Sequence, residues 1–346
     1  MFADLRVKFG QPCQILGWGH TDCQTDPGFN KVSQSDFIKD YLSHQARQEL
    51  FGHQSPWTDQ EINAKAEKWI NSIGINERSF FSGTVSEMGL IAARRCLKNA
   101  GFNPADLKLI IGGSNTHERY PSLADQIKCG LGQSSAACWD ITEACVTNAA
   151  AIQSGVAQIR SGLASNVLVV CSEKATILAN RDKYLYSNLF GDGAFAVLLA
   201  AGVQDSFLAF DIISLPEDGQ IDLIYKTDDG FEQNGPKVHG FVGKQVVDFL
   251  NKFLTKAGID PSEVDHLIPH QPSRKTLDLL EKEFRKICPN FKGQFHRNVE
   301  TMGNLSSVSP GLIIASSIES GVIKPDELKV IITFGSGLSI GAYAFR

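Results

Sequence analysis

Two distant segments of the chain repeat one pattern of apolar and polar positions. They read AARRCLKNAGFNPADLKLIIGG over residues 92–113 and VVDFLNKFLTKAGIDPSEVDHLIPH over residues 246–270. In each, apolar residues three and four positions apart lead to Ala-Gly, then to a polar turn with proline and a short apolar run. Ala100-Gly101 matches Ala257-Gly258 at an offset of 157 residues. The pattern predicts an amphipathic helix, a turn and a buried strand in both places.

The repeat continues downstream of both segments with a second helix and a second strand. These elements are predicted at residues 148–162 and 166–170 and, in the second copy, at residues 310–321 and 329–333. The shared order predicts an α/β protein of two pseudo-symmetric halves, residues 1–202 and 203–346. Because two such halves commonly bind ligands where they meet, we expect a site at equivalent loops of both.

One stretch departs from this pattern, because residues 20–67 are polar and rich in Gln and Asp. Thr58 and Glu61 have the spacing of a capping box, which predicts the start of a helix. We interpret the stretch as an insertion that covers either the site or an oligomer surface.

Composition limits the classes of function. Of the 346 residues, 42% are hydrophobic and 21% are charged, with a net charge of −5. This composition predicts a sizeable core and no general attraction to nucleic acid or to anionic membranes. The first residues do not resemble a secretory leader, and no long apolar run predicts membrane insertion, so we expect a cytoplasmic protein. The eight cysteines form no CxxC pair and no metal-ligand spacing, so we expect mostly buried thiols and no metal.

Cys145 is the candidate nucleophile among these cysteines. It lies in the segment WDITEACVTNAAA, where a short strand-like run meets small residues that begin a helix. A helix N-terminus offers unpaired N–H groups and a favourable dipole, so we expect a lowered thiol pKa there. The alternative is that Cys145 is one more small buried residue.

Two further residues fall at the same predicted seam. His270 follows a predicted buried strand in the segment IPHQPS, and a neutral imidazole there can donate to a carbonyl oxygen. Asn304 lies 159 residues after Cys145, which nearly reproduces the repeat offset. Each has a plainer alternative, a hydrogen-bonded structural histidine for His270 and a helix cap for Asn304. The coincidence of both with Cys145 favours a catalytic group.

A glycine-rich turn follows the last predicted strand in the segment FGSGLSIG. Glycine permits close approach of the backbone to a ligand, so the backbone N–H groups of the turn at residues 335–337 could complete an oxyanion hole with the N–H of Cys145. A simple hairpin turn is the alternative. Neither GxGxxG nor a P-loop pattern occurs in a strand-to-helix setting, which argues against nucleotide binding here.

Taken together, these segments resemble the β-ketoacyl synthase III branch of the thiolase superfamily. The matching motifs occur in the family's order over about residues 67–346. They are GINERSFF at 74–81, YPS at 120–122, the cysteine turn at 140–151, LFGDGAFAVLL at 189–199, PHQPS at 269–273, the Gly-Asn segment at 303–307 and the terminal FGSGLSIG.

The resemblance implies a five-layered αβαβα thiolase-like fold and Claisen condensation of acyl thioesters. Cys145 would accept an acyl group from CoA or an acyl carrier protein. A malonyl-type thioester would then lose CO₂, and His270 and Asn304 would stabilise the enolate that attacks the acyl group. The N–H groups of Cys145 and Ser336 would hold the tetrahedral oxyanion. The product would enter fatty-acid initiation or a specialised lipid or polyketide pathway.

The resemblance also implies substrate contacts at Trp69, Tyr120 and Phe334, a homodimer, and no cofactor besides the thioester substrates. Tyr120 matches a segment that reaches the partner's acyl pocket. The chain departs from the family pattern where arginines usually clamp CoA beside the tryptophan, because Ile73 and Tyr184 occupy those positions.

Glu118 is a further candidate, since related enzymes that condense two acyl chains without decarboxylation use a glutamate from this loop as a base. The alternative is a solvated loop carboxylate. Two other functional classes stay open: an acyltransferase that uses the same site without forming a C–C bond, and a non-catalytic scaffold subunit. The presence of both His270 and Asn304 favours condensation.

Overall fold

Two five-stranded sheets organise the chain, for which a computed structural model describes residues 10–117, 120–132, 135–215 and 221–346. The first sheet has the order β1-β7-β6-β4-β5 and the second β12-β11-β13-β14-β8. The strands of the first sheet are β1 (Cys13–His20), β4 (Leu109–Gly113), β5 (Ala137–Ile141), β6 (Asn166–Lys174) and β7 (Asp192–Ala201). Those of the second are β8 (Phe207–Ser214), β11 (His266–Pro269), β12 (Gln294–Phe295), β13 (Lys329–Gly335) and β14 (Ser339–Phe345).

Both sheets mix parallel and antiparallel pairs in corresponding places. β4 is parallel to β5 and β6, and β11 is parallel to β12 and β13. β6 and β13 each have one antiparallel neighbour, β7 and β14 respectively. The central strands are buried almost end to end, as expected of strands covered by helices on both faces.

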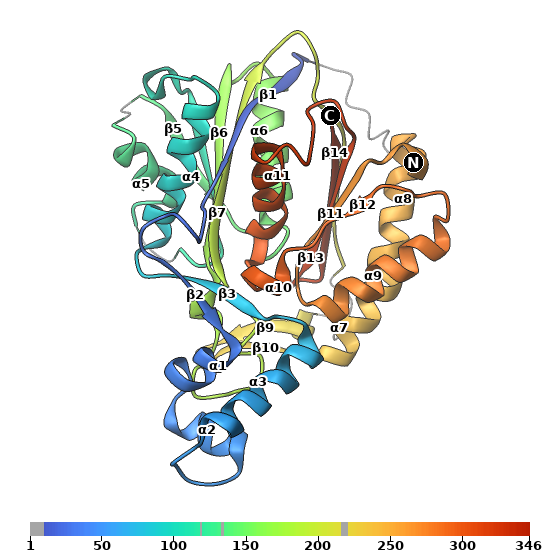
Figure 1. The fold of residues 1–346 in the computed structure, drawn as a ribbon. Helices are drawn as coiled ribbons and strands as arrows, with labels where there is room; N and C mark the ends of the chain where they lie inside the picture. Colours follow the sequence, from blue (N-terminus) through green and yellow to red (C-terminus); the bar gives the residue numbers. More distant parts are fainter. Residues whose placement is uncertain (1–9, 118–119, 133–134, 216–220) are drawn as a thin grey trace.

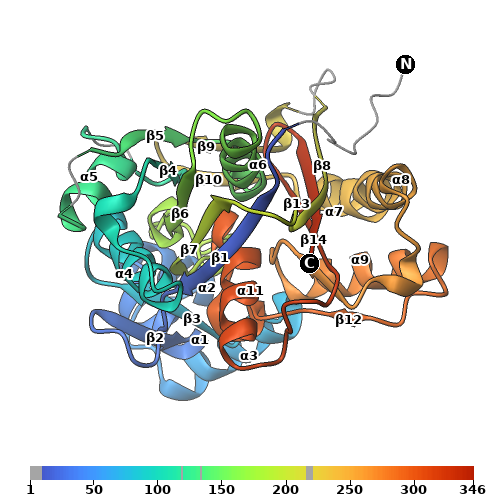
Figure 2. The ribbon, with the colours of Figure 1, turned by 90° about the horizontal axis from the view of Figure 1, so that it is seen from above.

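Helices form the other three layers. Between the sheets lie α6 (Thr147–Arg160) and α11 (Ser309–Glu319), which contact both sheets (Figures 1 and 2). The outer face of the first sheet carries α4 (Val85–Asn99) and α5 (Leu123–Gly130), and that of the second carries α8 (Val247–Ala257) and α9 (Arg274–Ile287). The five-layered αβαβα architecture is therefore confirmed. None of the helices within the described ranges is both long and apolar enough to cross a bilayer.

The internal repeat is present in three dimensions. α4 and α8 each end before a glycine with positive φ, Gly101 at 59° and Gly258 at 65°. A 3-10 turn follows each of them, η2 (Pro104–Asp106) and η6 (Pro261–Glu263), and leads into β4 and β11. The Ala-Gly and proline positions thus end the two helices in the same way, as predicted.

The polar stretch builds a small subdomain below the two sheets in Figure 1. Its elements are β2 (Phe29–Ser33), α1 (Gln34–Asp36), a π-helical turn η1 (Phe37–Tyr41), α2 (His44–Phe51) and α3 (Asp59–Ile73), and β2 pairs with β3 (Glu77–Phe81). Thr58 and Glu61 form the predicted capping box at the start of α3. A separate apolar cluster holds the subdomain together, and Trp69 and Tyr184 pack against its edge.

A two-stranded hairpin lies between this subdomain and the second sheet. It consists of β9 (Ile224–Thr227) and β10 (Gly230–Gln233), and α7 (Gly235–Phe241) follows it. Two side chains hold the hairpin in place: the Tyr186 hydroxyl donates to the Gln233 carbonyl at 3.0 Å, and the Ser336 hydroxyl donates to the Ile224 carbonyl at 2.5 Å. The remaining short elements are η3 (Ala175–Leu178), η4 (Ile221–Leu223), η5 (Val242–Val246), α10 (Val299–Met302) and η7 (Ser306–Val308).

Candidate active site

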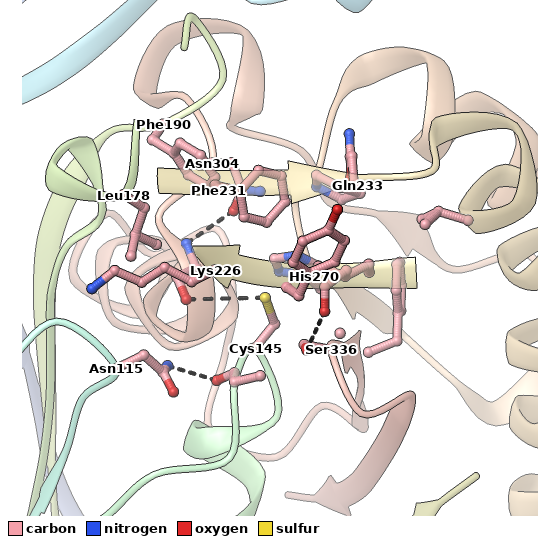
Figure 3. A pocket seen from close by; sticks show the side chains of 18 residues that line it. Asn115, Cys145, Leu178, Phe190, Lys226, Phe231, Gln233, His270, Asn304 and Ser336 are labelled. Atoms are coloured by element: carbon pink, nitrogen blue, oxygen red, sulfur yellow. Dashed lines mark hydrogen bonds between the residues drawn. The ribbon is translucent and has the colours of Figure 1, made fainter. Parts of the chain in front are cut away.

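A cavity of about 230 Å³ lies at the seam and is lined by residues of both repeats (Figure 3). The predicted residues that line it are Cys145, His270, Asn304, Phe334 and Ser336. The hairpin β9–β10 runs across the same cavity and contributes apolar side chains, among them Phe231. Segments far apart in the sequence therefore converge on one cavity.

Cys145 occupies the loop between β5 and α6, two residues before the first residue of α6. The preceding residue, Ala144, has a φ of 44°, an unfavourable conformation for a residue with a Cβ. Its carbonyl accepts hydrogen bonds from Asn115 Nδ2 at 2.7 Å and from Thr147 Oγ1 at 2.8 Å. Gly335 packs against the cysteine so closely that a Cβ there would lie 2.9 Å from the Cys145 Cβ. The loop is therefore fixed from both sides.

His270 follows β11 directly and is held between β13 and the cavity. Its backbone N–H donates to the Ile332 carbonyl at 2.8 Å. Its ring meets Phe334 edge to face, with ring centroids 5.3 Å apart. Burial lowers the pKa of the imidazole to about 4, against a smaller opposing effect of the Ser306 backbone. The ring is thus neutral at physiological pH and keeps one N–H to donate.

Asn304 is fixed through its backbone and through one side of its amide. Its N–H donates to the Leu189 carbonyl at 2.8 Å, and its carbonyl accepts from the Gly191 N–H at 3.1 Å, so the LFGDG motif positions it. Its Oδ1 accepts the Ser306 N–H at 2.9 Å. Since the oxygen is occupied, the amide presents its Nδ2–H groups as donors to a ligand in the cavity.

The Cys145 thiol is neutral in the resting site. Its pKa is raised to about 12, chiefly by burial; Ser306, whose hydroxyl lies 4.0 Å from the sulfur, opposes the rise, and the nearby charge of Glu173 adds a smaller contribution to it. The prediction that the helix N-terminus lowers the thiol pKa is therefore wrong. The reason is that removal of the thiolate from water outweighs the dipole of a helix that begins two residues later.

The rate of Cys145 alkylation by iodoacetamide is therefore expected to rise about tenfold per pH unit from pH 7 to 10, without a plateau. The thiolate is the reactive form, and at a pKa of about 12 it is a fraction of only about 10⁻⁴ at pH 8. Mass spectrometry of the Cys145 peptide measures the rate, and the Cys145→Ala variant corrects for the other thiols. A rate that levels off below pH 8 would contradict the neutral-thiol description.

A second cavity, of about 540 Å³, adjoins the first and leads outward. The two share Phe231, Gln233, Val238, Pro272, Asn304 and Phe334 among their lining residues. The outer cavity also includes Ser72, Pro236 and Lys275, all exposed. We refer to the outer cavity as the channel, because it extends from the lining residues that it shares with the inner cavity to exposed residues of α3, α7 and α9.

Two other predicted site residues, Trp69 and Tyr120, are not among the lining residues of the inner cavity. Trp69 lies in α3, and its ring and that of Tyr184 are nearly parallel, with centroids 6.5 Å apart. Tyr120 is fully exposed. Glu118 lies outside the described residues. Ile73, which replaces an expected arginine, lines the outer cavity.

Several polar residues of the site were not found from the sequence. Asn115 lines the cavity next to the cysteine loop, and Ser306 lies beside the thiol. Glu173 is completely buried in β6 and hydrogen-bonded to Asn115 and Ser307. A carboxylate two positions after the apolar run VLVVC of the predicted buried strand was the available signal. Within the described ranges, no group of His, Cys, Asp and Glu side chains is arranged to hold a metal ion.

A five-layered αβαβα fold with this cavity at its seam defines a thiolase-fold transferase. Residues 139–216 match the family model for 3-oxoacyl-[acyl-carrier-protein] synthase III, and residues 254–346 match its C-terminal model. The β-ketoacyl-[acyl-carrier-protein] synthase III of Listeria monocytogenes is 31% identical over 299 residues, which cover 83% of this chain and 92% of the relative. The chain belongs to the β-ketoacyl-[acyl-carrier-protein] synthase III family of condensing transferases.

Solved structures agree with this assignment. The 3-oxoacyl-[acyl-carrier-protein] synthase III of Aquifex aeolicus has a TM-score of 0.80 at 25% identity and covers 96% of this chain and 99% of its own. The priming β-ketosynthase of a polyketide biosynthetic pathway has a TM-score of 0.82 at 24% identity and covers 99% and 98%. The fold is therefore shared along nearly the whole chain.

Proposed function

We propose that the protein loads an acyl group on Cys145 and joins it to a malonyl- or β-ketoacyl-type thioester by Claisen condensation. The observation that carries this proposal is the convergence of a thiol, a neutral imidazole and an amide on one cavity. Family membership supports the reaction class, and the channel to the surface supports a long thioester arm as the substrate.

The first half-reaction is transfer of the acyl group to sulfur. The Cys145 sulfur attacks the thioester carbonyl, the bond to the donor sulfur breaks, and the thiol proton of Cys145 ends on the departing thiol. Cys145 and Ser336 both line the cavity. Their N–H groups therefore suit the oxyanion that forms on the carbonyl oxygen.

The second half-reaction uses the other two side chains. A malonyl thioester loses CO₂, and the electron pair of the broken bond forms an enolate whose oxygen accepts hydrogen bonds from the His270 ring and Asn304 Nδ2. The enolate carbon then attacks the acyl carbonyl, a C–C bond forms, and the Cys145 sulfur departs and regains a proton. Neutral donors suit this step because they stabilise the enolate without protonating it.

The mouth of the channel suits an anionic carrier. Lys275 lines the mouth, and Lys237 lies between two lining residues of α7, Pro236 and Val238; both lysines are exposed. Ammonium groups attract the phosphate of a phosphopantetheine arm, whether the arm is carried by CoA or by an acyl carrier protein. No further cofactor is proposed.

A homodimer completes the proposal. β5 is an edge strand of the first sheet and carries exposed residues, among them Trp139. Tyr120 is fully exposed on the segment that precedes α5. We propose that a second copy covers this edge and that Tyr120 reaches the partner's acyl pocket, since unpaired edge strands favour pairing with another chain.

The test is a two-stage acylation experiment. The protein is incubated with acyl-CoA and acyl-carrier-protein donors of increasing chain length, and intact mass and peptide mapping locate the acyl group; malonyl-carrier protein is then added. The proposal requires an adduct on Cys145 and release of CO₂ with a β-ketoacyl product. Absence of any adduct would refute it. Transfer to a hydroxyl or amine acceptor without a C–C bond would establish the acyltransferase alternative, and condensation without CO₂ release the non-decarboxylating one.

Trp69→Ala is expected to raise the KM for acyl-CoA about fivefold and to leave the KM for acyl-carrier protein unchanged. The ring lies parallel to Tyr184 beside the channel, where adenine but not a carrier protein would contact it. Loss of one aromatic contact costs about 1 kcal/mol. Trp57→Ala is the matched control, since Trp57 packs on Phe51 within the same subdomain. Equal changes for both donors would contradict adenine binding at Trp69.

A further inference from the structure

Glu173 is a fully buried carboxylate with five hydrogen-bond donors around it. Oε1 accepts from Asn115 Nδ2 at 2.5 Å and from Ser307 Oγ at 2.8 Å. Oε2 accepts from the Asn115 N–H at 3.0 Å, Thr116 Oγ1 at 2.9 Å and Ser114 Oγ at 3.4 Å. Within the described ranges no lysine, arginine or histidine forms an ion pair with Glu173. Neutral donors alone therefore hold this buried group.

Asn115 connects Glu173 with the loop that contains Cys145. Asn115 Nδ2, which donates to Glu173, also donates to the carbonyl of Ala144 at 2.7 Å. Ala144 immediately precedes Cys145 and has a φ of 44°. A strained residue keeps its conformation only where its surroundings enforce it. Glu173 therefore contributes, through Asn115, to the orientation of the loop that presents the Cys145 thiol.

Ser307, which also donates to Glu173, connects the carboxylate with the turn that contains Asn304. Ser307 belongs to the second half of the chain and follows Ser306, which has a φ of 52°. The Ser306 N–H donates to Asn304 Oδ1, and its hydroxyl lies 4.0 Å from the Cys145 sulfur. The Ser307 hydroxyl anchors this turn on Glu173 across the seam. The same carboxylate thus binds the strained turns on both sides of the cavity.

A neutral acceptor would not replace the carboxylate in this place. All five groups donate to it, and a carboxylate can accept all of them because it has two oxygens and no hydrogen. A glutamine would turn an amide N–H₂ towards one of these sets of donors. Burial raises the pKa of Glu173, and the hydrogen bonds from Ser307, Asn115 and Thr116 oppose this rise. A buried carboxyl group without a cation is costly, so its presence at the seam calls for a function that a smaller apolar side chain would not supply.

We infer that Glu173 is a positioning residue that couples the Cys145 loop to the Asn304–Ser307 turn across the seam. The inference rests on the proposed function, in which these two segments carry the two half-reactions. Two hydrogen-bonded connections start at Glu173: the Asn115 arm leads to the Ala144 carbonyl, and the Ser307 arm leads to the Asn304–Ser307 turn. The inference predicts that each arm can be removed without the other. Removing the Asn115 arm impairs acyl loading first, whereas removing the Ser307 arm impairs decarboxylation and condensation first.

The experiment compares Glu173→Gln, Glu173→Asp, Asn115→Ala and Ser307→Ala with the native protein. Loading of Cys145 is followed by mass spectrometry, and decarboxylation by CO₂ release from a malonyl thioester. Glu173→Gln and Glu173→Asp are expected to slow both steps at least tenfold. Glutamine has one hydrogen-bond acceptor fewer than glutamate, and the aspartate side chain is too short to reach both turns. Asn115→Ala is expected to slow loading at least fivefold more than decarboxylation, and Ser307→Ala to do the reverse.

The rate of Cys145 alkylation is a measurement that a purely structural role of Glu173 would not change. The Glu173 charge raises the thiol pKa, so Glu173→Gln is expected to alkylate faster than the native protein at pH 8, although it turns over more slowly. Glu173→Asp keeps the charge and should not show this gain. A general loosening of the site would affect both variants alike.

Ser172→Ala is the matched control in the same strand. Ser172 is equally buried, but its hydroxyl donates to the Val85 carbonyl at 2.7 Å, towards α4 rather than towards the cavity. Its loss should lower thermal stability without changing the ratio of the two half-reactions. If Ser172→Ala matched the Glu173 variants in that ratio and in alkylation, or if Glu173→Gln changed neither, the positioning role would be overturned.

Two outcomes need a separate comparison: Glu173 variants that do not fold, and a native protein that loads no acyl group. If the Glu173 variants do not fold, Asn115→Ala and Ser307→Ala still test the separable arms, because both retain Glu173. If the native protein loads no acyl group from any donor, the proposed function fails. The alkylation comparison still tests the coupling in that case, because it needs no substrate.

Discussion

Cys145→Ala is expected to form no acyl-enzyme and to lose at least about 10³-fold in turnover. No other thiol is positioned to substitute, since Cys145 is the cysteine that lines the inner cavity. The change removes one sulfur atom from a half-buried site, so the melting temperature should stay within a few degrees of that of the native protein. Intact-mass analysis after incubation with acyl thioesters measures the adduct, and product analysis measures turnover.

Cys129→Ala is the matched control for this variant. Cys129 is a free, exposed cysteine in α5, outside both cavities. It should retain both the adduct on Cys145 and the native rate. An acyl group that persists on the Cys145→Ala protein, or a loss of activity shared by Cys129→Ala, would show that the nucleophile lies elsewhere.

His270→Ala and Asn304→Ala are each expected to lower decarboxylation and condensation by about 10²- to 10³-fold while acyl loading continues. Each removes one preorganised donor to the enolate oxygen, and loss of one such donor typically has this effect. Loading depends on the backbone N–H groups beside Cys145, which these substitutions leave in place. A burst of acyl-enzyme without subsequent CO₂ release is therefore the expected signature, measured by rapid-quench mass spectrometry and CO₂ detection.

Two further variants, His270→Ala/Asn304→Ala and His53→Ala, are compared with the single variants. Because both donors serve one oxygen, the loss in His270→Ala/Asn304→Ala should be smaller than the product of the single losses. His53→Ala is the control, since His53 is exposed in the polar subdomain and pairs with Glu61. If His270→Ala abolished loading as completely as condensation, the histidine would belong to the first half-reaction instead.

Local sequence patterns were sufficient to predict an α/β protein of two similar halves, whereas the five-layered architecture was implied by the resemblance to a known family. The repeat was visible because the same signals, an Ala-Gly helix end and a proline turn, recur at one offset and act over a few residues. The helices α6 and α11 and the strands that follow them were expected for the same reason, although β6 and β13 extend further than the apolar runs that predicted them. Short-range periodicity predicts elements better than it predicts their ends.

The protonation state of the nucleophile could not be predicted in this way. The pKa of Cys145 depends on burial, on Ser306 from the other half of the chain and on Glu173, which lies in β6. Asn115 lies in a loop and Ser307 in η7, and nothing in their local sequence shows that the fold brings both to one carboxylate. The hairpin over the cavity depends likewise on a contact between Ser336 and Ile224, 112 positions apart.

The protonation state of the Cys145 thiol also determines how fast peroxides oxidise it. Peroxides attack thiolates, and a cysteine held at a pKa of about 12 exposes almost none to them. The sulfur is therefore resistant to conversion into sulfenic acid during the interval between substrates. Thiol enzymes that keep a permanently ionised cysteine expose that cysteine to oxidative inactivation, whereas Cys145 is held in its protonated form.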